Sequence, residues 1–218
     1  MRAALPELEA SRLPHRILIV DDNSPDGTGA LADELARELE CVQVLHRPGK
    51  QGLGRAYLAG FAVALSAGAD LVMEMDADFS HDPADLPRLI AAAEAADLVL
   101  GSRYVPGGGV TQWGRMRRFV SRGGSAYARW LLGVPVRDLT GGFKCFNRRV
   151  LEAIDLEDVQ ADGYGFQIEL TYKAIRAGFT VTEVPITFRE REVGSSKMTS
   201  KIVLEAVWKV PALKLRVR

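Results

Sequence analysis

Short apolar runs alternate with helical patterns through the first hundred residues, and this alternation constrains the fold more than any other feature. The runs that predict buried strands are residues 16–21, 42–45, 70–75 and 98–100. The segments that predict helices between and after them are residues 30–39, 53–65 and 83–95. This strand–helix order predicts an α/β fold with a mostly parallel central sheet, flanked by helices and wound with right-handed crossovers.

The second half of the chain is less regular. Its predicted elements are a basic helix at 113–132 broken near Gly123 and Gly124, a strand at 143–147, a helix at 166–176, a strand at 179–188, and a partly helical end interrupted by Pro211. Pro185 favours an edge position for the last strand, because proline cannot donate to the ladder. We expect a single domain, residues 1–218, with 199–218 as a basic and apolar C-terminal tail.

Composition argues against several classes of protein. The two cysteines, Cys41 and Cys145, form no metal-ligand pattern and fit a reducing compartment. We see no signal peptide and no apolar run long enough to span a bilayer, so we expect a soluble or peripheral protein. The absence of GxGxxG and Walker motifs argues against dinucleotide dehydrogenases and P-loop enzymes. A formal net charge of zero, without a basic-aromatic motif, argues against nucleic-acid binding.

Charge is unevenly distributed along the chain. Residues 21–97 contain 15 acidic and 5 basic residues, whereas residues 103–129 contain 6 arginines and no acidic residue. Residues 189–218 contain 8 basic and 3 acidic residues. An acidic half followed by basic segments suggests a metal site that faces anion-binding elements. Solvated surface charge is the simpler interpretation for any single residue.

The sharpest feature is the sequence Asp76, Ala77, Asp78 at the end of the third predicted strand. Two carboxylates spaced in this way can approach one hard cation through the loop. A cation would also offset the cost of placing both charges at the rim of the core. The alternative is a polar loop that happens to contain two aspartates. His81 is either a ligand or a supporting residue of this site, or a surface histidine before the next helix.

A dense polar turn follows the first predicted strand. Asp21, Asp22 and Asp26 are placed to accept hydrogen bonds from a base or ribose, because ligands of such sheets bind beyond the carboxyl ends of the strands. The alternative for Asp26 or Thr28 is to cap the next helix.

Later loops supply candidates for phosphate binding. Gly52 lets the backbone approach a ligand, and Lys50 is placed to contact a phosphate at the following helix N-terminus, although an ordinary turn is the alternative. Arg103 follows the fourth strand and is placed to bind a phosphate at the same end of the sheet. Gln167 and Glu169 begin a helix, where Glu169 is alternatively only a partner of the helix dipole. A final basic, glycine-containing loop carries Arg189, Arg191 and Lys197.

Taken in order, these motifs resemble those of family 2 inverting glycosyltransferases with the GT-A fold, the Rossmann-like fold of nucleotide-diphospho-sugar transferases. More narrowly, they resemble the polyprenol-phosphate (dolichol-phosphate) mannose synthases. The order and spacing of seven stretches between Ile17 and Met198 is very specific for the family. These stretches are residues 20–28, 52–57, 74–78, 101–104, 138–143, 163–169 and 188–197.

The resemblance implies transfer of mannose from GDP-mannose to a polyprenyl phosphate, with inversion at the sugar C1 and with Mg²⁺ or Mn²⁺ as cofactor. It assigns Asp21 to the nucleotide, and Asp76 and Asp78 to the donor and the metal. It assigns to the phosphates around the reacting centre the cations Arg103, Arg191 and Lys197. The catalytic candidates are therefore Asp78 and these three cations.

The chain departs from the family pattern in two places. The family normally begins with a strand that ends in a nucleotide-contacting motif, whereas residues 1–6 resemble the helix after that strand. We therefore expect the first strand to be missing. Ser80 occupies a position at which some relatives carry glutamine as a metal ligand. The alternatives are an inactive, shortened nucleotide-sugar-binding module, or transfer of another sugar, such as glucose from UDP-glucose.

The acceptor that the resemblance implies is a lipid. The basic segments 115–129 and 201–218 are expected to meet an anionic membrane at about 1 kcal/mol per close cation. Trp113, Trp130 and Trp208 are candidates for insertion at the interface, with packing in the core as the alternative. We therefore expect a peripheral location at the cytoplasmic face of the membrane, where a separate protein is one source of an anchor.

Overall fold

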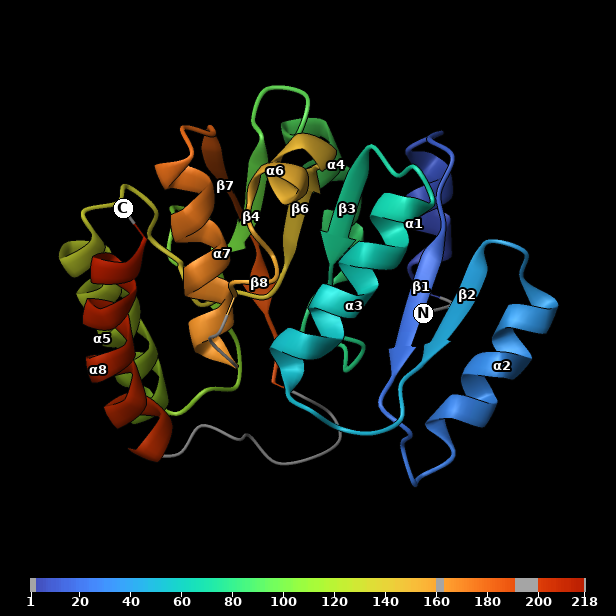
Figure 1. Ribbon diagram of the computed structural model, residues 1–218, viewed down its shortest axis with the longest axis horizontal. Helices are drawn as coiled ribbons and strands as arrows, with labels where there is room; N and C mark the ends of the chain where they lie inside the picture. The colour runs from blue at the N-terminus through green and yellow to red at the C-terminus, as the bar shows by residue number, and fades with distance from the viewer. Residues whose placement is uncertain (1–2, 160–162, 191–199, 218) are drawn as a thin grey trace.

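The computed structural model describes residues 3–159, 163–190 and 200–217, and their strands form three sheets (Figure 1). A two-stranded parallel sheet pairs β1 (Ile17–Asp21) with β2 (Val42–His46). A four-stranded sheet has the order β3 (Leu71–Glu74), β6 (Lys144–Asn147), β4 (Leu98–Ser102) and β7 (Val181–Pro185). A small parallel pair joins β5 (Gly109–Val110) to β8 (Thr187–Phe188).

The directions of the strands confirm a mostly parallel sheet. β3 and β4 are both antiparallel to β6 and therefore run the same way, and β7 is parallel to β4. The antiparallel strand, β6, lies in the middle of the four-stranded sheet between β3 and β4. β7 lies at the edge, as Pro185 predicts.

Helices cover both faces of the four-stranded sheet. Those that follow or precede its strands are α3 (Leu53–Ser66), η1 (Pro83–Asp85), α4 (Leu86–Ala92), α6 (Arg148–Ala153) and α7 (Tyr164–Arg176). The others are α1 (Leu5–Ala10), α2 (Thr28–Glu38), α5 (Arg115–Leu132) and α8 (Ser200–Arg216). In Figure 1, α3 and α7 lie in front of the sheet and α4 lies behind it.

The hydrophobic core is divided by the sheet. Leu98 and Leu100 of β4 pack with residues of α3, α6 and α7, whereas Val99 packs with residues of α4. Because successive side chains of a strand point to opposite faces, this division shows that β4 is buried on both sides. Such burial explains why the strand is a continuous apolar run in the sequence.

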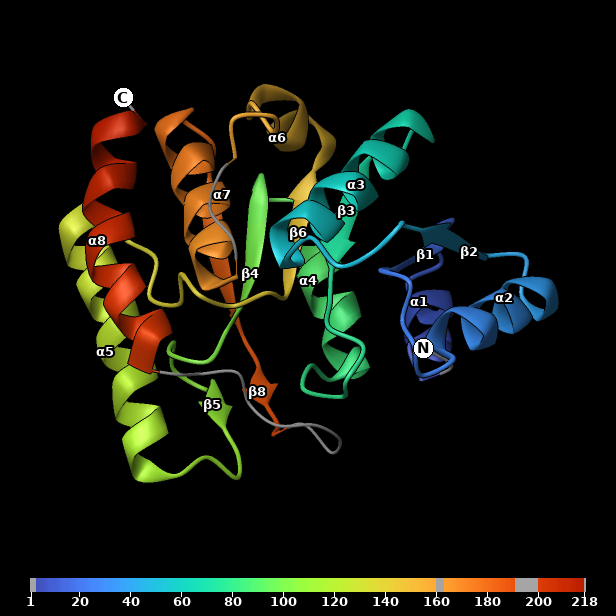
Figure 2. The same ribbon diagram turned by 60° about the horizontal axis from the view of Figure 1, so that its bottom comes forward.

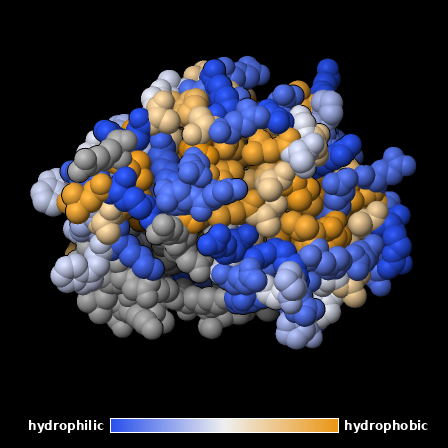
Figure 3. All heavy atoms as spheres, in the orientation of Figure 1, coloured by the Kyte–Doolittle hydropathy of each residue, from blue (hydrophilic) through white to orange (hydrophobic). Residues whose placement is uncertain are grey.

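The sheet is interrupted between β1 and β3. Within the described residues, β1 pairs only with β2 and β3 pairs only with β6, so one edge of each is unpaired (Figure 2). Residues 17–20 of β1 are half-buried, and Figure 3 shows hydrophobic residues over β1 and α3. Helix α3 contacts both β1 and β3 and bridges the interruption.

Two predicted helix breaks are wrong. Helix α5 continues through Gly123 and Gly124, and α8 continues through Pro211. The two helices pack against each other, and Val210 and Leu213 of α8 are buried. Glycine costs an exposed helix about 1 kcal/mol and proline about 3 kcal/mol, and packing of this kind overrides such local preferences.

Candidate active site

The predicted site residues follow strands that end on one side of the molecule. Figure 1 shows the arrowheads of β1, β2 and β4 toward its lower edge. Asp21 ends β1, Asp76 and Asp78 follow β3, and Arg103 follows β4. This is the side of an α/β sheet at which ligands usually bind.

The loop that carries the two aspartates is held by three hydrogen bonds. The hydroxyl of Tyr57 donates to Asp76 Oδ1 at 3.2 Å. The backbone N–H of Asp76 donates to Nδ1 of His81 at 3.2 Å, and the backbone N–H of Ser80 donates to Asp78 Oδ1 at 3.1 Å. Asp76 and Asp78 remain half-buried and Ala77 is exposed, so the loop faces solvent while its base is fixed.

His81 is a buried residue of this loop, and the surface interpretation of it is wrong. Its side chain stacks on Phe143 with ring centroids 4.9 Å apart and meets the edge of Phe188 at 5.4 Å. Burial lowers the pKa of His81 below its usual 6.5, against the raising effect of the nearby Asp76 carboxylate. The ring is therefore a neutral acceptor for the loop backbone at neutral pH.

The donor set suits a hard divalent cation that is shared with a ligand. In the part of the chain that the structure describes, no group of three or more His, Cys, Asp and Glu side chains surrounds a common point. Two carboxylates alone do not complete a protein cage. Mg²⁺ is commonly held in this way, by one or two carboxylates together with substrate phosphates and water. Asp76 and Asp78 fit that arrangement.

A buried charged pair lies under the loop. The ammonium of Lys144 is 3.8 Å from Glu74 Oε1 and donates to Oε1 of Gln167 at 2.5 Å and to its backbone carbonyl at 2.9 Å. Burial raises the pKa of Glu74 to about 8 and lowers that of Lys144 to about 8. The sequence analysis did not single out this pair. The sequence did contain a sign of it, because Glu74 and Lys144 are charged residues inside the predicted strands 70–75 and 143–147.

Arg103 is engaged with Asp138 inside the fold. Its Nε and Nη2 donate to the two carboxylate oxygens at 2.7 Å each, and Nη2 also donates to Thr140 Oγ1 at 2.8 Å. Burial by itself raises the pKa of Asp138, but the charge and hydrogen bonds of Arg103 outweigh it and hold the pKa below 3.8. The guanidinium also lies 5.7 Å from the ring of Trp113. The role of Arg103 toward a phosphate stays a prediction.

The turn after β1 is stabilised by local contacts. Asp21 accepts from the N–H of Ser24 at 3.4 Å, and its carboxylate is 3.7 Å from His46 Nδ1. Asp22 pairs with Arg47. Gly29 is required here, because a Cβ at that position would lie 2.7 Å from Asp21 Oδ2.

Three other candidates sit at helix starts. Asp26 accepts from the N–H and the hydroxyl of Thr28, the first residue of α2, at 3.1 and 2.6 Å, but the N-cap is Gly27 and makes no side-chain capping bond, so the alternative that Asp26 or Thr28 is the cap residue is wrong. Gly52 is the N-cap of α3 and has a φ of 102°, a conformation that favours glycine. Lys50 is exposed beside it.

The remaining candidates are divided between the interior and the undescribed segment. Gln167 is bound to Lys144, as described above. Glu169 is buried and pairs with Lys173 at 3.6 Å and with Arg216 of α8. Arg191 and Lys197 lie outside the described residues.

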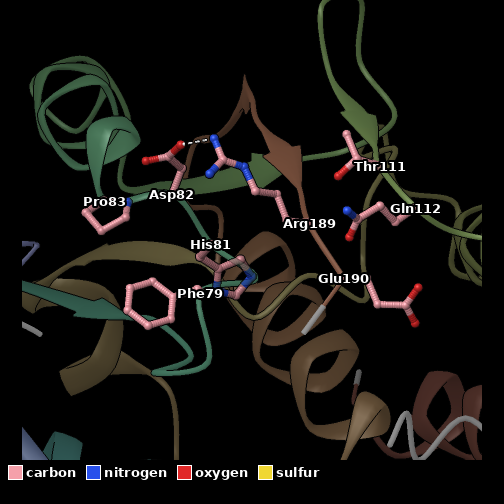
Figure 4. A pocket seen from close by; sticks show the side chains of 8 residues that line it. All are labelled: Phe79, His81, Asp82, Pro83, Thr111, Gln112, Arg189 and Glu190. Carbon is pink, nitrogen blue, oxygen red and sulfur yellow. Dashed lines mark hydrogen bonds and ion pairs between the residues drawn. The ribbon is translucent and has the colours of Figure 1, made fainter. Parts of the chain in front are cut away.

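A pocket of about 200 Å³ adjoins the aspartate loop (Figure 4). Its lining residues are Phe79, His81, Asp82, Pro83, Thr111, Gln112, Arg189 and Glu190. Arg189 Nη2 donates to Asp82 Oδ2 at 2.7 Å, and Glu190 pairs with Arg117 at 2.5 Å. Because its charged side chains are paired within the protein, the pocket is not an evident anion site.

Comparison with models of known protein families identifies the family of this chain. Residues 4–155 match the model of the family described as "Glycosyl transferase family 2". The chain belongs to this family. Membership of this family makes the protein an enzyme, a glycosyltransferase. Its GT-A-type α/β architecture agrees with the fold predicted from the motifs.

Two curated relatives are similar over most of the glycosyltransferase. A polyprenol monophosphomannose synthase of Mycolicibacterium smegmatis is 54% identical over 93% of the chain and 77% of its own length. An undecaprenyl-phosphate mannosyltransferase of Micrococcus luteus is 49% identical over 95% of the chain and 82% of its own length. These similarities confirm the predicted resemblance to the polyprenol-phosphate subgroup.

Solved structures show the same fold at much lower identity. Glucosyl-3-phosphoglycerate synthase from Mycobacterium tuberculosis, in complex with phosphoglyceric acid, aligns with a TM-score of 0.61 and 18% identity over 96% of this chain and 83% of that one. A complex of that enzyme with Mn²⁺, UDP-glucose and glycerol 3-phosphate aligns with a TM-score of 0.60. At this identity the comparison concerns the fold alone.

Exposed aromatic residues mark the surface of α5 and α8. Trp130 is 78% exposed and Trp208 is 77% exposed, whereas Trp113 is buried against Phe188. The expectation that Trp113 inserts into a membrane interface is therefore wrong, and core packing of Trp130 is also excluded. No helix of the described residues is both long and apolar enough to cross a bilayer.

Proposed function

We propose that the glycosyltransferase transfers mannose from GDP-mannose to a polyprenyl phosphate, with inversion at the sugar C1, in the presence of Mg²⁺ or Mn²⁺. The observation that carries this proposal is the identity of 54% and 49% to a polyprenol monophosphomannose synthase and an undecaprenyl-phosphate mannosyltransferase. The two half-buried carboxylates after β3 supply a site of the kind that a nucleotide-diphosphate donor and a divalent cation require.

The proposed donor site spans the ends of β1 and β3. Asp76 and Asp78 hold the cation, and Ala77 gives the diphosphate access to the backbone between them. Asp21 and Asp22 face the nucleotide, while Asp26, Lys50 and Gly52 contribute from the starts of α2 and α3. Gln167 and Glu169 support the site from the interior. Gln167 does so through its hydrogen bonds with Lys144 beneath the aspartate loop, and Glu169 through its ion pair with Arg216 of α8. The acceptor phosphate meets the cations Arg103, Arg191 and Lys197.

The proposed reaction is a single in-line displacement. A phosphomonoester has a second pKa of about 6, so the acceptor is already largely ionised at neutral pH and requires no strong general base. This agrees with the aspartate loop, which holds a buried neutral histidine as an acceptor of a backbone N–H. When bound, the divalent cation neutralises charge on the leaving diphosphate. The cationic side chains bring the two anionic substrates together.

The proposed location is the cytoplasmic face of the membrane, with α5 at the surface. Met116, Phe119 and Trp130 of α5 are all at least 74% exposed, and their spacing of three and eleven residues places them on one side of the helix. Arginines accompany this stripe, and α5 contains no acidic residue. An apolar stripe with basic neighbours is typical of a helix that lies on an anionic bilayer. A membrane-anchor partner is compatible with this arrangement.

The test is product formation with a short polyprenyl phosphate and Mn²⁺, with GDP-mannose and UDP-glucose compared as donors. We expect transfer from GDP-mannose, and a loss on the order of 100-fold or more for Asp78→Ala. Asp70→Ala is the matched control, because Asp70 is an exposed aspartate before the amino end of β3. Preference for UDP-glucose would overturn the donor assignment. Binding of GDP without turnover would support a binding module instead.

A further inference from the structure

Both the side chain and the backbone of Asp76 are held by aromatic residues, the partly buried Tyr57 and the buried His81. Tyr57 of α3 donates to its carboxylate, and His81 accepts from its N–H, each at 3.2 Å. The two contacts reach Asp76 from opposite directions along the chain, 19 residues before it and five residues after it. They therefore fix both where the carboxylate lies and where the chain leaves β3.

Tyr57 is itself immobilised by aromatic packing. Its ring lies parallel to that of Phe166 in α7, with centroids 5.9 Å apart and planes at 8°. The ring of Phe61, one turn further along α3, also lies against it, with centroids 6.1 Å apart. Since the ring is stacked between α3 and α7, the hydroxyl points at Asp76 without a large further loss of side-chain entropy.

His81 is immobilised in a comparable way. Its side chain is 3% exposed, and the stacked Phe143 and the edge of Phe188 fix the plane of the ring. Because Nδ1 accepts the N–H of Asp76, the neutral ring carries its proton on Nε2. The orientation of the histidine is thus determined by packing and by this hydrogen bond together.

The loop between Asp76 and His81 contains one residue with an unfavourable backbone conformation. Phe79 has a φ of 61°, which is uncommon for a residue with a bulky side chain, and its ring is 55% exposed. Strain of this kind persists where the surrounding contacts determine the conformation, and it is concentrated at functional sites. The exposed ring gains little packing from that conformation, so the contacts around Asp76 and Asp78 are the evident source of the constraint.

We infer that Tyr57 and His81 are positioning residues, which hold Asp76 in the geometry that binds the cation and the donor diphosphate. This inference rests on the proposed function, because it takes Asp76 to be a ligand. Tyr57 orients the carboxylate, and His81 fixes the backbone from which it projects. Neither needs to touch the substrate. Partners that orient a metal ligand typically alter metal affinity or activity about 10- to 100-fold when they are removed.

The test measures binding of Mn²⁺ in the presence of GDP by calorimetry, together with the KM for the donor and kcat. Tyr57→Phe removes only the hydroxyl, and His81→Phe keeps a ring to stack on Phe143 but removes the acceptor. We expect each to weaken Mn²⁺ binding about tenfold and to raise the KM for GDP-mannose more than it lowers kcat. Tyr172→Phe is the control, because Tyr172 is a buried tyrosine of the α7 core that is not in contact with the loop.

A rescue distinguishes positioning from simple support of the fold. His81→Asn places an amide oxygen near the position of Nδ1, whereas His81→Gln places its amide further from the chain. We expect His81→Asn to recover most of the Mn²⁺ affinity and His81→Gln to recover little. Thermal unfolding of every variant shows whether a change in affinity follows the acceptor atom or the stability of the protein. Tyr57→Phe is the mildest substitution and keeps the inference testable if the histidine variants fail to fold.

The outcomes separate this inference from the proposed function. If Asp76→Ala binds Mn²⁺ and GDP as the wild type does, the metal site itself is wrong. If Asp76→Ala loses binding while Tyr57→Phe and His81→Phe keep wild-type affinity, the positioning inference alone is overturned. Equal recovery by His81→Asn and His81→Gln would also overturn the role assigned to Nδ1.

Discussion

The ammonium of Lys144 lies 3.8 Å from the carboxylate of Glu74 across neighbouring strands β6 and β3, and neither side chain is exposed. Gln167 completes the coordination of the ammonium from α7. Such a pair adds little net stability over an apolar pair of the same size, but the loss of one partner leaves an uncompensated buried charge. The network therefore ties β3, the strand that leads into the aspartate loop, to helix α7.

Above pH 8, Lys144→Met should destabilise the protein by about 3–5 kcal/mol, because Glu74 must then either carry an unpaired buried charge or bind a proton against the pH. The double variant Glu74→Met with Lys144→Met should recover most of this loss, since both charges are removed together. Urea unfolding of the wild type, the two single variants and the double variant measures the coupling. Additive effects in this cycle would show that the two charges do not interact.

The stability of the Lys144→Met variant should also depend on pH. Burial raises the pKa of Glu74 above its value of 4.5 in the unfolded chain, to about 8 in the wild type, and loss of the Lys144 charge, which lowers this pKa, raises it further. The folded state then binds the proton more tightly, so the contribution of this group is full below pH 4.5 and is lost as the pH rises through the folded pKa. We expect Lys144→Met to be more stable at pH 5 than at pH 8. The double Met variant, which lacks both groups, serves as the control.

Asp138→Asn should destabilise the protein strongly, by about 3–5 kcal/mol. The substitution removes the negative charge of Asp138, and the positive charge of Arg103 is then left unpaired in the interior. The matched control is Asp158→Asn, since the Asp158 side chain is 45% exposed in its pair with Lys173. That variant should change the free energy of unfolding by at most about 1 kcal/mol. Thermal or urea unfolding compares the two. Similar, small effects would contradict the buried ion pair.

His46 should titrate above its usual value in the folded protein. The hydrogen bond to Asp33, at 2.8 Å, is the main cause of the raised pKa, and the charge of Asp21 adds to it. The stabilising contribution of this group is therefore full below pH 6.5, and it is lost as the pH rises through the folded pKa. An NMR titration measures the shift. Asp33→Asn should move the pKa back toward 6.5, and an unchanged pKa would exclude Asp33 as its cause.

Exposed arginines of α5 should contribute to binding of anionic vesicles. Arg118→Gln and Arg122→Gln should each weaken binding about fivefold, which corresponds to about 1 kcal/mol per cation near the surface. Phe119→Ser should weaken binding at any lipid charge, because it removes apolar area rather than charge. Arg37→Gln, on exposed α2, is the control and should have no effect. Vesicle sedimentation at two salt concentrations separates the charge effect from the apolar effect.

The sequence by itself determined the main elements and the positions of the acidic loops. Buried strands are short apolar runs, and a helix has apolar residues at a period of 3.6, so both patterns are visible without knowledge of the neighbours. Asp76 and Asp78 stand out because charge follows such a run directly. The order of the motifs was sufficient for the family, which the comparisons confirm.

The tertiary structure decided which charges face a ligand and which face each other. The sequence makes Arg103 a candidate for phosphate binding, whereas its buried partner Asp138 is 35 residues away and appears only when the chain folds. The burial of His81, the antiparallel strand between β3 and β4, and the continuity of α5 through its glycines have the same origin. Local periodicity reports one element at a time, whereas partners and burial depend on contacts between elements that are distant in sequence.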